Sequence, residues 1–322
     1  CVKERGRELG IAASRLRYGA SDWDPPSPFW DAPDRNDHAP ALWSDGETLF
    51  HFNGLSAGPN YGKNLALVMR TSTDNGVTWS KARLVNPERG LPSQPVPCVT
   101  STREGCIILV SDGTHCSPRQ ASALWMSQDG GQTWSLSEGV VPGIHAGVVQ
   151  LRDGRLMALG RGVLEGRMPL SLSSDMGRTW TYQPSQFPPI SAGQRLVLMR
   201  LREGPILLCS FTGPAKSQTP MPIKDQSGKE RLVTGLFAAV SFDEGLTWPF
   251  IRLVSDDGPG RELETMDGKP FTMGFDSAEP MGYLAACQTD DGLIHLISSR
   301  LHYTFNLKWV MTRPPSKPAR GR

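Results

Sequence analysis

The chain has 322 residues with 38% hydrophobic content, enough for a large core, and its 34 glycines and 27 prolines suit many short strands joined by tight turns. Its 34 basic and 32 acidic residues leave a formal charge of +2, which excludes a global field for nucleic acid or a membrane surface. No apolar run approaches the ~20 residues of a membrane span, and no signal peptide is recognised, although a mature secreted chain would have lost one.

The sequence contains no motif of a cofactor or metal enzyme. It has no phosphate loop, H-E-x-x-H or dinucleotide fingerprint, so we expect no required cofactor and no metal. The six cysteines include no C-x-x-C pair, and Cys98, Cys106 and Cys209 lie in apolar runs where buried free thiols are expected. The compartment stays open, with a secreted or periplasmic location favoured over the cytoplasm.

Residues 1–36 are expected to form an N-terminal segment. Within it, "SDWDPPSPFWDAPDRN" at 21–36 is rich in Pro and Asp, which predicts a loop over one face rather than a regular strand. Part of residues 8–30 can contribute strands to a closing sheet.

From residue 38 onward a pair of apolar strands around a turn, usually with glycine, recurs five times. The copies are "HAPALWSDGETLFHFN" from 38, "VPCVTSTREGCIILVSD" from 96, "HAGVVQLRDGRLMALGR" from 145, "RLVLMRLREGPILLCSF" from 195 and "YLAACQTDDGLIHLISSR" from 283.

A second repeat, S-x-D-x-G-x-T-W, alternates with these strand pairs at 72–79, 127–134, 173–180 and 241–248. It predicts a rigid hairpin turn in which Asp accepts backbone hydrogen bonds, Gly takes a positive φ, and Trp packs between units. The four Asp residues are therefore poor catalytic candidates. A strand pair followed by an octet hairpin makes a four-stranded antiparallel sheet, so we predict an all-β propeller spanning 37–312 as one domain.

Three segments lie outside the repeats. Residues 212–235 are a polar insertion that we interpret as an extended loop, "LHYTFNLKWV" near the C-terminus is a candidate strand of a sixth blade, and 313–322 form a basic, flexible tail.

The outer ends of the five strand pairs must lie on one face of a ring, and the residues there are polar. One set begins the first strands: His38, Val96, His145, Arg195 and Tyr283. The other ends the second strands: Asn53, Asp112, Arg161, Phe211 and Ser299, next to Arg300. This mixture favours a pocket for a polar ligand, although exposed strand ends are commonly polar in any protein.

Individual roles follow from side-chain chemistry. Arg161 can grip a carboxylate through its planar fork, and Arg195 and Arg300 are alternatives for the same role. His145 and His38, the latter beside Asp37, can move protons. Tyr283 needs a nearby base to act as a nucleophile, and Glu279 lies four residues before it. His302 and Tyr303 can complete the rim or serve as strand residues.

The octets and strand pairs over residues 36–300 resemble the sialidase superfamily with BNR, or Asp-box, repeats. The resemblance implies a six-bladed propeller, three arginines that hold a sialic acid carboxylate, a Tyr nucleophile activated by Glu, and an Asp acid/base. "GYLAACQTDDGLIHLI" is similar to the strand that bears the family nucleophile, at Tyr283, and "QLRDGRLMALGRG" is similar to the segment that ends in the second arginine, at Arg161.

The chain departs from this pattern at several positions. His38 stands where the family has its first arginine, and His145 stands where the third unit begins with Glu. The third arginine has no clear match beyond Arg195 or Arg300, and no Asp in 53–64 corresponds to the acid/base loop. A histidine is only partly charged near neutral pH, so the carboxylate clamp is weaker than in the family.

The sequence therefore favours a sialidase-like, exo-acting glycoside hydrolase with a carbohydrate substrate and no nucleic-acid partner. Two alternatives remain: a polysaccharide lyase acting on uronic acids, and a non-catalytic glycan-binding propeller.

Overall fold

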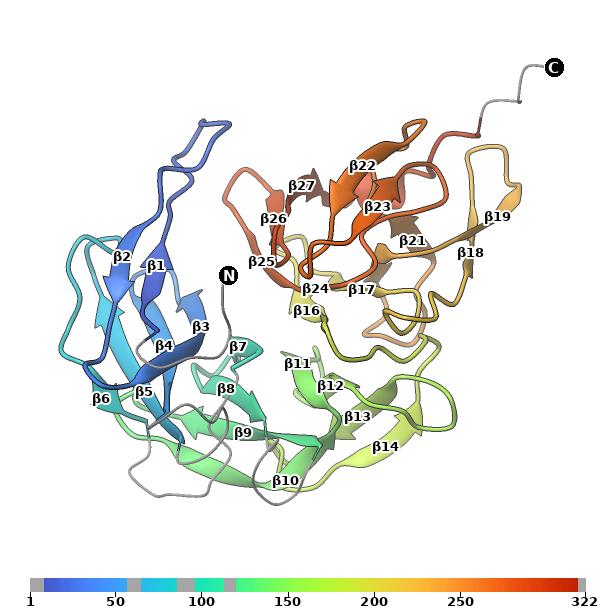
Figure 1. Cartoon of the computed structure of the whole chain (residues 1–322). Coiled ribbons are helices and arrows are strands. Elements are labelled where there is room, and N and C mark those ends of the chain that lie inside the picture. Colours follow the sequence, from blue (N-terminus) through green and yellow to red (C-terminus); the bar gives the residue numbers. More distant parts are fainter. Residues whose placement is uncertain (1–8, 57–64, 86–95, 113–119, 318–322) are drawn as a thin grey trace. The chain divides into compact units, whose positions relative to one another are not determined.

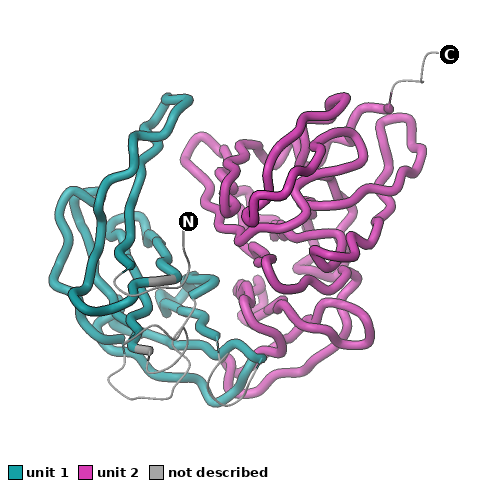
Figure 2. The backbone as a smooth tube through the Cα atoms, viewed as in Figure 1, with its two compact units in different colours: residues 1–140 teal, residues 141–322 magenta. Residues whose placement is uncertain are grey.

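A computed structural model describes residues 9–56, 65–85, 96–112 and 120–317. The chain divides into two compact units, Cys1–Val140 and Val141–Arg322, which we call unit 1 and unit 2 (Figure 2). Within the described residues the regular structure is strand apart from one short helix, α1 (Leu307–Met311). The predicted all-β class is confirmed.

Unit 1 contains two antiparallel meanders of four strands (Figure 1). The first is formed by β3 (Asn36–Ser44), β4 (Leu49–Ser56), β5 (Leu65–Ser72) and β6 (Arg83–Leu84). The second is formed by β7 (Cys98–Ser101), β8 (Ile107–Asp112), β9 (Ala121–Ser127) and β10 (Ser135–Pro142), and β10 crosses the boundary between the units. A separate hairpin pairs β1 (Ile11–Ala13) with β2 (Ser27–Trp30).

Unit 2 contains three further meanders. The first is β11 (Ile144–Gln150), β12 (Leu156–Arg161), β13 (Pro169–Ser173) and β14 (Thr181–Pro184). The second is β16 (Val197–Arg200), β17 (Ile206–Phe211), β20 (Leu236–Ser241) and β21 (Phe250–Leu253). The third has three strands among the described residues: β25 (Ala285–Gln288), β26 (Leu293–Ile297) and β27 (His302–Asn306).

Five consecutive meanders match the five strand pairs of the sequence, one to each sheet, as propeller blades require. Apolar side chains of neighbouring sheets in the same unit pack together. In unit 1, Phe52 of β4 meets Trp134 edge to face at 5.9 Å. In unit 2, Phe187 stacks on Phe237 at 5.7 Å and meets the edge of Trp248 at 5.2 Å. The Trp of an octet thus enters the core, as the sequence predicts.

The octets form the predicted turns. The Asp129 carboxylate accepts hydrogen bonds from the Thr133 amide at 2.8 Å, from the Thr133 hydroxyl at 2.6 Å and from the Ser127 hydroxyl at 2.8 Å. Gly131 has a φ of +83°, and the same bonds recur around Asp175. These hydrogen bonds hold the pKa of Asp175 at about 2, so the octet carboxylates are occupied by structure.

The structure departs from the sequence interpretation in the irregular segments. The 212–235 insertion is not an extended loop, because it contains a hairpin of β18 (Met221–Lys224) and β19 (Glu230–Val233). The 21–36 segment contains β2, so it is not strand-free. "LHYTFN" supplies β27 to the fifth sheet, and "LKWV" continues into α1. Pattern alone misses these pairings because each has few residues and little alternation.

The first residues of the basic tail are tied to unit 2. The Pro314 carbonyl accepts a hydrogen bond from the Gln226 amide at 2.9 Å, and the Pro315 carbonyl accepts one from Arg231 Nη1 at 3.1 Å. Lys317 forms an ion pair with Asp276. Up to residue 317, therefore, the tail has fixed contacts.

Candidate functional site

Three of the predicted site residues meet in unit 2 around the ring of Tyr283. β15 (Gln194–Arg195) pairs in parallel with β24 (Gly282–Tyr283), which sets Arg195 directly opposite Tyr283. The Arg195 guanidinium carbon lies 5.2 Å from the centre of the tyrosine ring, within range of a cation–π contact. The His145 ring approaches the same ring edge to face, with centroids 5.7 Å apart.

His145 owes its position to a β-bulge. The β11–β12 register shifts between Ile144 and Gly147, and His145 takes a φ of +56°, which a residue with a side chain rarely adopts. Its side chain is 94% buried. Strained backbone of this kind is typical of functional sites, where the surrounding structure holds a side chain in one direction.

Arg161 ends β12 and is anchored from one side. Its Nη1 donates to the backbone carbonyl of Gln194 at 3.1 Å and, more weakly, to that of Ser191 at 3.4 Å. Nε and Nη2 make no hydrogen bond within the described residues, and the side chain is half-buried. The guanidinium is therefore oriented while part of its fork stays available for a ligand carboxylate.

Gln194, which the sequence analysis does not single out, holds these elements together. Its side chain is fully buried; Oε1 accepts from the Ser191 amide at 2.7 Å, and Nε2 donates to the carbonyls of Gly213 and Pro280 at 2.9 Å each. It thereby joins the Arg161 anchor to the chain that leads into Tyr283. We call His145, Arg161, Gln194, Arg195 and Tyr283 the unit 2 cluster.

Glu279 is fully buried beside this cluster, and its carboxylate is committed. Oε1 accepts from the Ser298 hydroxyl at 2.6 Å and Oε2 accepts from the Tyr303 hydroxyl at 2.9 Å. Burial raises the pKa of Glu279 despite these two hydrogen bonds, and burial together with the Glu279 charge raises the pKa of Tyr303. The tyrosine bonded to Glu279 is Tyr303, whereas the Tyr283 hydroxyl makes no hydrogen bond within the described residues.

The other unit 2 candidates have partners elsewhere. Arg300 forms an exposed ion pair with Glu264 of β22 (Arg261–Glu264), a strand paired with β23 (Pro270–Met273). His302 stacks on His295 with ring nitrogens 3.1 Å apart, and burial lowers the pKa of His302.

In unit 1 the predicted residues form separate polar contacts. Asp37 is buried and accepts hydrogen bonds from Asn53 at 2.7 Å, from the Trp30 indole at 2.8 Å and from the Ala32 amide at 2.7 Å. Burial raises the pKa of Asp37, and the three hydrogen bonds oppose that rise. Asp112 is buried too and accepts from Ser122 at 3.0 Å.

Two predictions for unit 1 concern residues that lie partly outside those that the structure describes. His38 pairs with Gly54 in the β3–β4 ladder, but its side chain lies outside the described residues. Most of the 53–64 segment, in which the sequence offers no acid/base Asp, lies outside them as well.

An aromatic cluster in unit 1 was not expected from sequence. Buried Arg70 donates from Nε to His51 at 3.1 Å and lies 4.4 Å and 4.6 Å from the ring centres of Phe29 and Trp30. Burial and then the Arg70 charge lower the pKa of His51 to about 3. A lone Arg in a strand gives no sequence signal for such a contact.

Among the described residues, no three His, Cys, Asp or Glu side chains gather as metal ligands would. Within the same residues, no helix has the length and apolar character that crossing a lipid bilayer requires.

Comparison with known proteins identifies the family. The sequence profile of the BNR repeat-like domain matches residues 2–296. A curated relative, a sialidase of Bacteroides fragilis (strain YCH46), is 25% identical over 209 residues, which are 60% of this chain and 35% of the relative. The chain thus spans about a third of the length of that relative.

Solved structures show the same fold. Hadza microbial sialidase Hz136 superposes with a TM-score of 0.59 at 18% identity, over 94% of this chain and 60% of that one. The intramolecular trans-sialidase from Ruminococcus gnavus, in complex with oseltamivir carboxylate, also gives 0.59, at 13% identity over 95% and 90% of the two chains. The chain belongs to the BNR repeat-like domain family, within the sialidase superfamily of β-propellers.

Proposed function

We propose that this chain is a sialidase-like carbohydrate-active enzyme, an exo-acting glycoside hydrolase for glycans with an acidic sugar, built on a six-bladed propeller. The proposal rests on two contacts of the Tyr283 ring: one with the Arg195 guanidinium and one with the His145 ring. A phenol, a permanent cation and an imidazole at one point are the groups that acyl or glycosyl transfer needs.

The proposed roles follow from the contacts. Arg161 and Arg195 bind and orient the substrate carboxylate, since arginine matches the two oxygens of that group. His145 accepts the proton of the Tyr283 hydroxyl, and the adjacent Arg195 stabilises the negative charge that this leaves on the phenolic oxygen. The Tyr283 oxygen attacks the anomeric carbon as the glycosidic C–O bond breaks, and His145 gives its proton to the leaving oxygen. Water then transfers a proton to His145 and attacks the anomeric carbon, and His145 returns that proton to the departing Tyr283 oxygen. Because the Asp37 carboxylate already accepts three hydrogen bonds, we give proton transfer to His145 rather than to Asp37.

We assign Glu279 and Tyr303 a supporting role. Both the burial of Tyr303 and the adjacent carboxylate raise the pKa of its hydroxyl, which opposes formation of the phenolate that a nucleophile requires. Gly282 leaves room for this pair, because a Cβ there would lie 3.1 Å from Glu279 Oε1.

One observation favours a second candidate, elimination on uronic acids. The Glu279 carboxylate accepts hydrogen bonds from Ser298 and Tyr303, whereas among the described residues His145 and Arg195 lie against the Tyr283 ring. A tyrosine and a histidine as proton acceptor and donor, with an arginine on the carboxylate, suit removal of a proton next to that carboxylate.

Turnover of chromogenic sialosides and of uronide oligosaccharides tests both candidates. Hydrolysis releases the chromophore, whereas elimination creates an unsaturated uronate that absorbs in the ultraviolet. We expect Tyr283→Phe and His145→Ala to lower kcat/KM at least about 10²-fold, the usual contribution of general acid–base groups. The control is Tyr182→Phe, at a tyrosine that is 48% exposed in β14. Wild-type activity in both cluster variants would falsify the assignment, and binding without turnover in the wild type would leave a glycan-binding propeller.

A further inference from the structure

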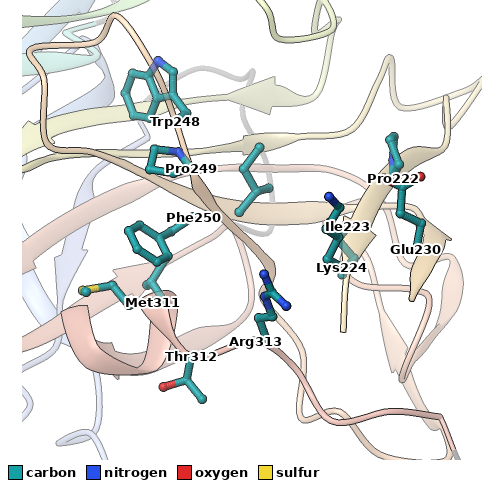
Figure 3. A pocket seen from close by; sticks show the side chains of 12 residues that line it. Pro222, Ile223, Lys224, Glu230, Trp248, Pro249, Phe250, Met311, Thr312 and Arg313 are labelled. Carbon is teal, nitrogen blue, oxygen red and sulfur yellow. The ribbon is translucent and has the colours of Figure 1, made fainter. Parts of the chain in front are cut away.

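A pocket in unit 2 shares no residue with the unit 2 cluster (Figure 3). Its volume is about 310 Å³, and three segments line it: the β18–β19 hairpin, residues 248–251 before and at the start of β21, and residues 310–313 at the end of α1 and after it. Ligand pockets range over about 300–1,000 Å³, so this one suits a single sugar unit rather than an oligosaccharide.

One side of the pocket is apolar. Trp248, the last residue of the fourth octet, is fixed by a hydrogen bond from its indole to the Gly245 carbonyl at 3.2 Å. Pro249 and half-buried Phe250 follow it, and Met311, 37% exposed, adds a flexible side chain from the end of α1. This surface offers the nonpolar contact that one face of a pyranose ring can make.

The other side carries charge. Lys224, Glu230 and Arg313 are exposed at the pocket, and none of the three side chains has an ion pair or hydrogen bond within the described residues. Neighbouring arginines differ, because Arg231 and Arg252 both pair with Asp257. Two cations and one anion give the pocket a net positive charge, which complements an anionic ligand.

The backbone around Arg313 is held in place before any ligand arrives. Arg252 donates from Nη1 to the carbonyls of Trp309 and Thr312 at 2.8 Å each. On the far side, the Pro314 carbonyl accepts from the Gln226 amide at 2.9 Å. Such preorganisation lowers the entropy that a ligand must remove on binding.

We propose that this pocket is a non-catalytic binding site for an acidic monosaccharide unit of a glycan. Arg313 and Lys224 bind its carboxylate, Glu230 accepts hydrogen bonds from its hydroxyls, and the ring rests on Phe250 and Met311. The choice of a glycan rests on the proposed function, whereas the preference for an anion rests on the pocket itself. The enzyme then holds its polymer at two places, and the second contact raises the effective concentration of chain ends.

Carbon-13 labelling of the methionine methyl groups gives a local reporter, because Met311 lines the pocket. Its resonance is assigned with Met311→Leu, and the titrants are methyl glucuronide and N-acetylneuraminic acid, with methyl glucoside as the neutral probe. The titrations are made in an Arg161→Ala background, in which the unit 2 cluster lacks one of its proposed carboxylate ligands. A shift of the Met311 resonance in this background therefore reports binding at the pocket and not at the cluster. Turnover by the wild type is measured separately, which distinguishes failure of this proposal from failure of the proposed function.

We expect both acidic sugars to shift the Met311 methyl resonance and the neutral sugar to leave it unmoved. Lys224→Ala with Arg313→Ala raises the apparent Kd at least about tenfold, as loss of charge-assisted hydrogen bonds should. Lys229→Ala, a cation of the same hairpin outside the lining, leaves the Kd unchanged. Unchanged resonances of the other methionines show that the variants are folded.

Three results would overturn the proposal: equal shifts with the neutral sugar, an unchanged Kd in the double variant, or no shift up to about 50 mM ligand, beyond the range of useful affinity. A shift by only one acid narrows the sugar and supports the site.

Discussion

Replacing Gln194 with leucine tests whether this buried side chain holds the unit 2 cluster together. Leucine is of similar size, but it removes three short hydrogen bonds, one accepted from the Ser191 amide and two donated to the carbonyls of Gly213 and Pro280, together with a long one from the Ser191 hydroxyl at 3.5 Å. At about 1 kcal/mol each, the loss in free energy of unfolding is about 3 kcal/mol. The Pro280 carbonyl keeps a weaker bond from Gln218 at 3.3 Å, which moderates the loss.

Urea denaturation followed by tryptophan fluorescence measures this loss, with Gln183→Leu on the exposed strand β14 as the matched control. The control should change the free energy of unfolding by less than about 0.5 kcal/mol. If Gln194→Leu lowers the free energy of unfolding no more than its control does, Gln194 does not organise the cluster and does not link Arg161 to the segment that precedes Tyr283.

Gln194→Glu sharpens the test through pH. A carboxylate there is buried and faces two carbonyl oxygens, so its pKa in the folded state must rise above the value of about 4.3 in the unfolded chain. Since the folded pKa is the higher one, the variant should be most stable below pH 4 and lose stability as the pH rises. A variant that is equally stable at pH 4 and pH 8, relative to wild type, contradicts the burial that we describe.

Three further predictions concern single residues. The Thr179 hydroxyl and amide lower the pKa of Asp175 to about 2, so ionised Asp175 stabilises the fold above pH 4 and loses that effect toward pH 2. Asp175→Asn should therefore lower the thermal midpoint at pH 7 but not near pH 2. A lower midpoint that persists at pH 2 contradicts this prediction. Phe187→Ala should cost about 3–5 kcal/mol in urea denaturation, because the ring is 99% buried between two aromatic neighbours; a cost below about 1 kcal/mol refutes its core role. Burial raises the pKa of Glu279, so this residue destabilises the folded wild type least below pH 4 and increasingly as the pH rises. Glu279→Gln should therefore be more stable relative to wild type at pH 8 than at pH 4. The reverse order of the urea midpoints contradicts this prediction.

The repeats made most of the fold predictable. The turn of each octet is determined by residues within the octet. In the second octet, hydrogen bonds join Ser127, Asp129, Gly131 and Thr133, and such a local pattern is visible in the sequence. Strand pairs around a tight turn are equally local.

What the sequence did not reveal depends on long-range contacts. The strain at His145 is a property of the β11–β12 bulge, and nothing in "GIHAGVV" marks it. Spacing suggested Glu279 as the partner of Tyr283, whereas its hydrogen bond to Tyr303 comes from a strand that lies 24 residues onward. Gln194 has no sequence signal, because a glutamine gains importance only from the carbonyls that the fold brings to it.

The parallel pairing of β15 with β24 determines at which stage of folding the unit 2 cluster can form. The Gln194 side chain bonds to Pro280, a partner 86 residues away in the chain, and the whole of the β16, β17, β20 and β21 sheet lies between them in sequence. Closing so long a loop is entropically unfavourable until the intervening sheet has collapsed. During synthesis, the unit 2 cluster must therefore be among the last parts of this unit to assemble, and a nascent chain that stops before residue 280 can form strands but not the cluster.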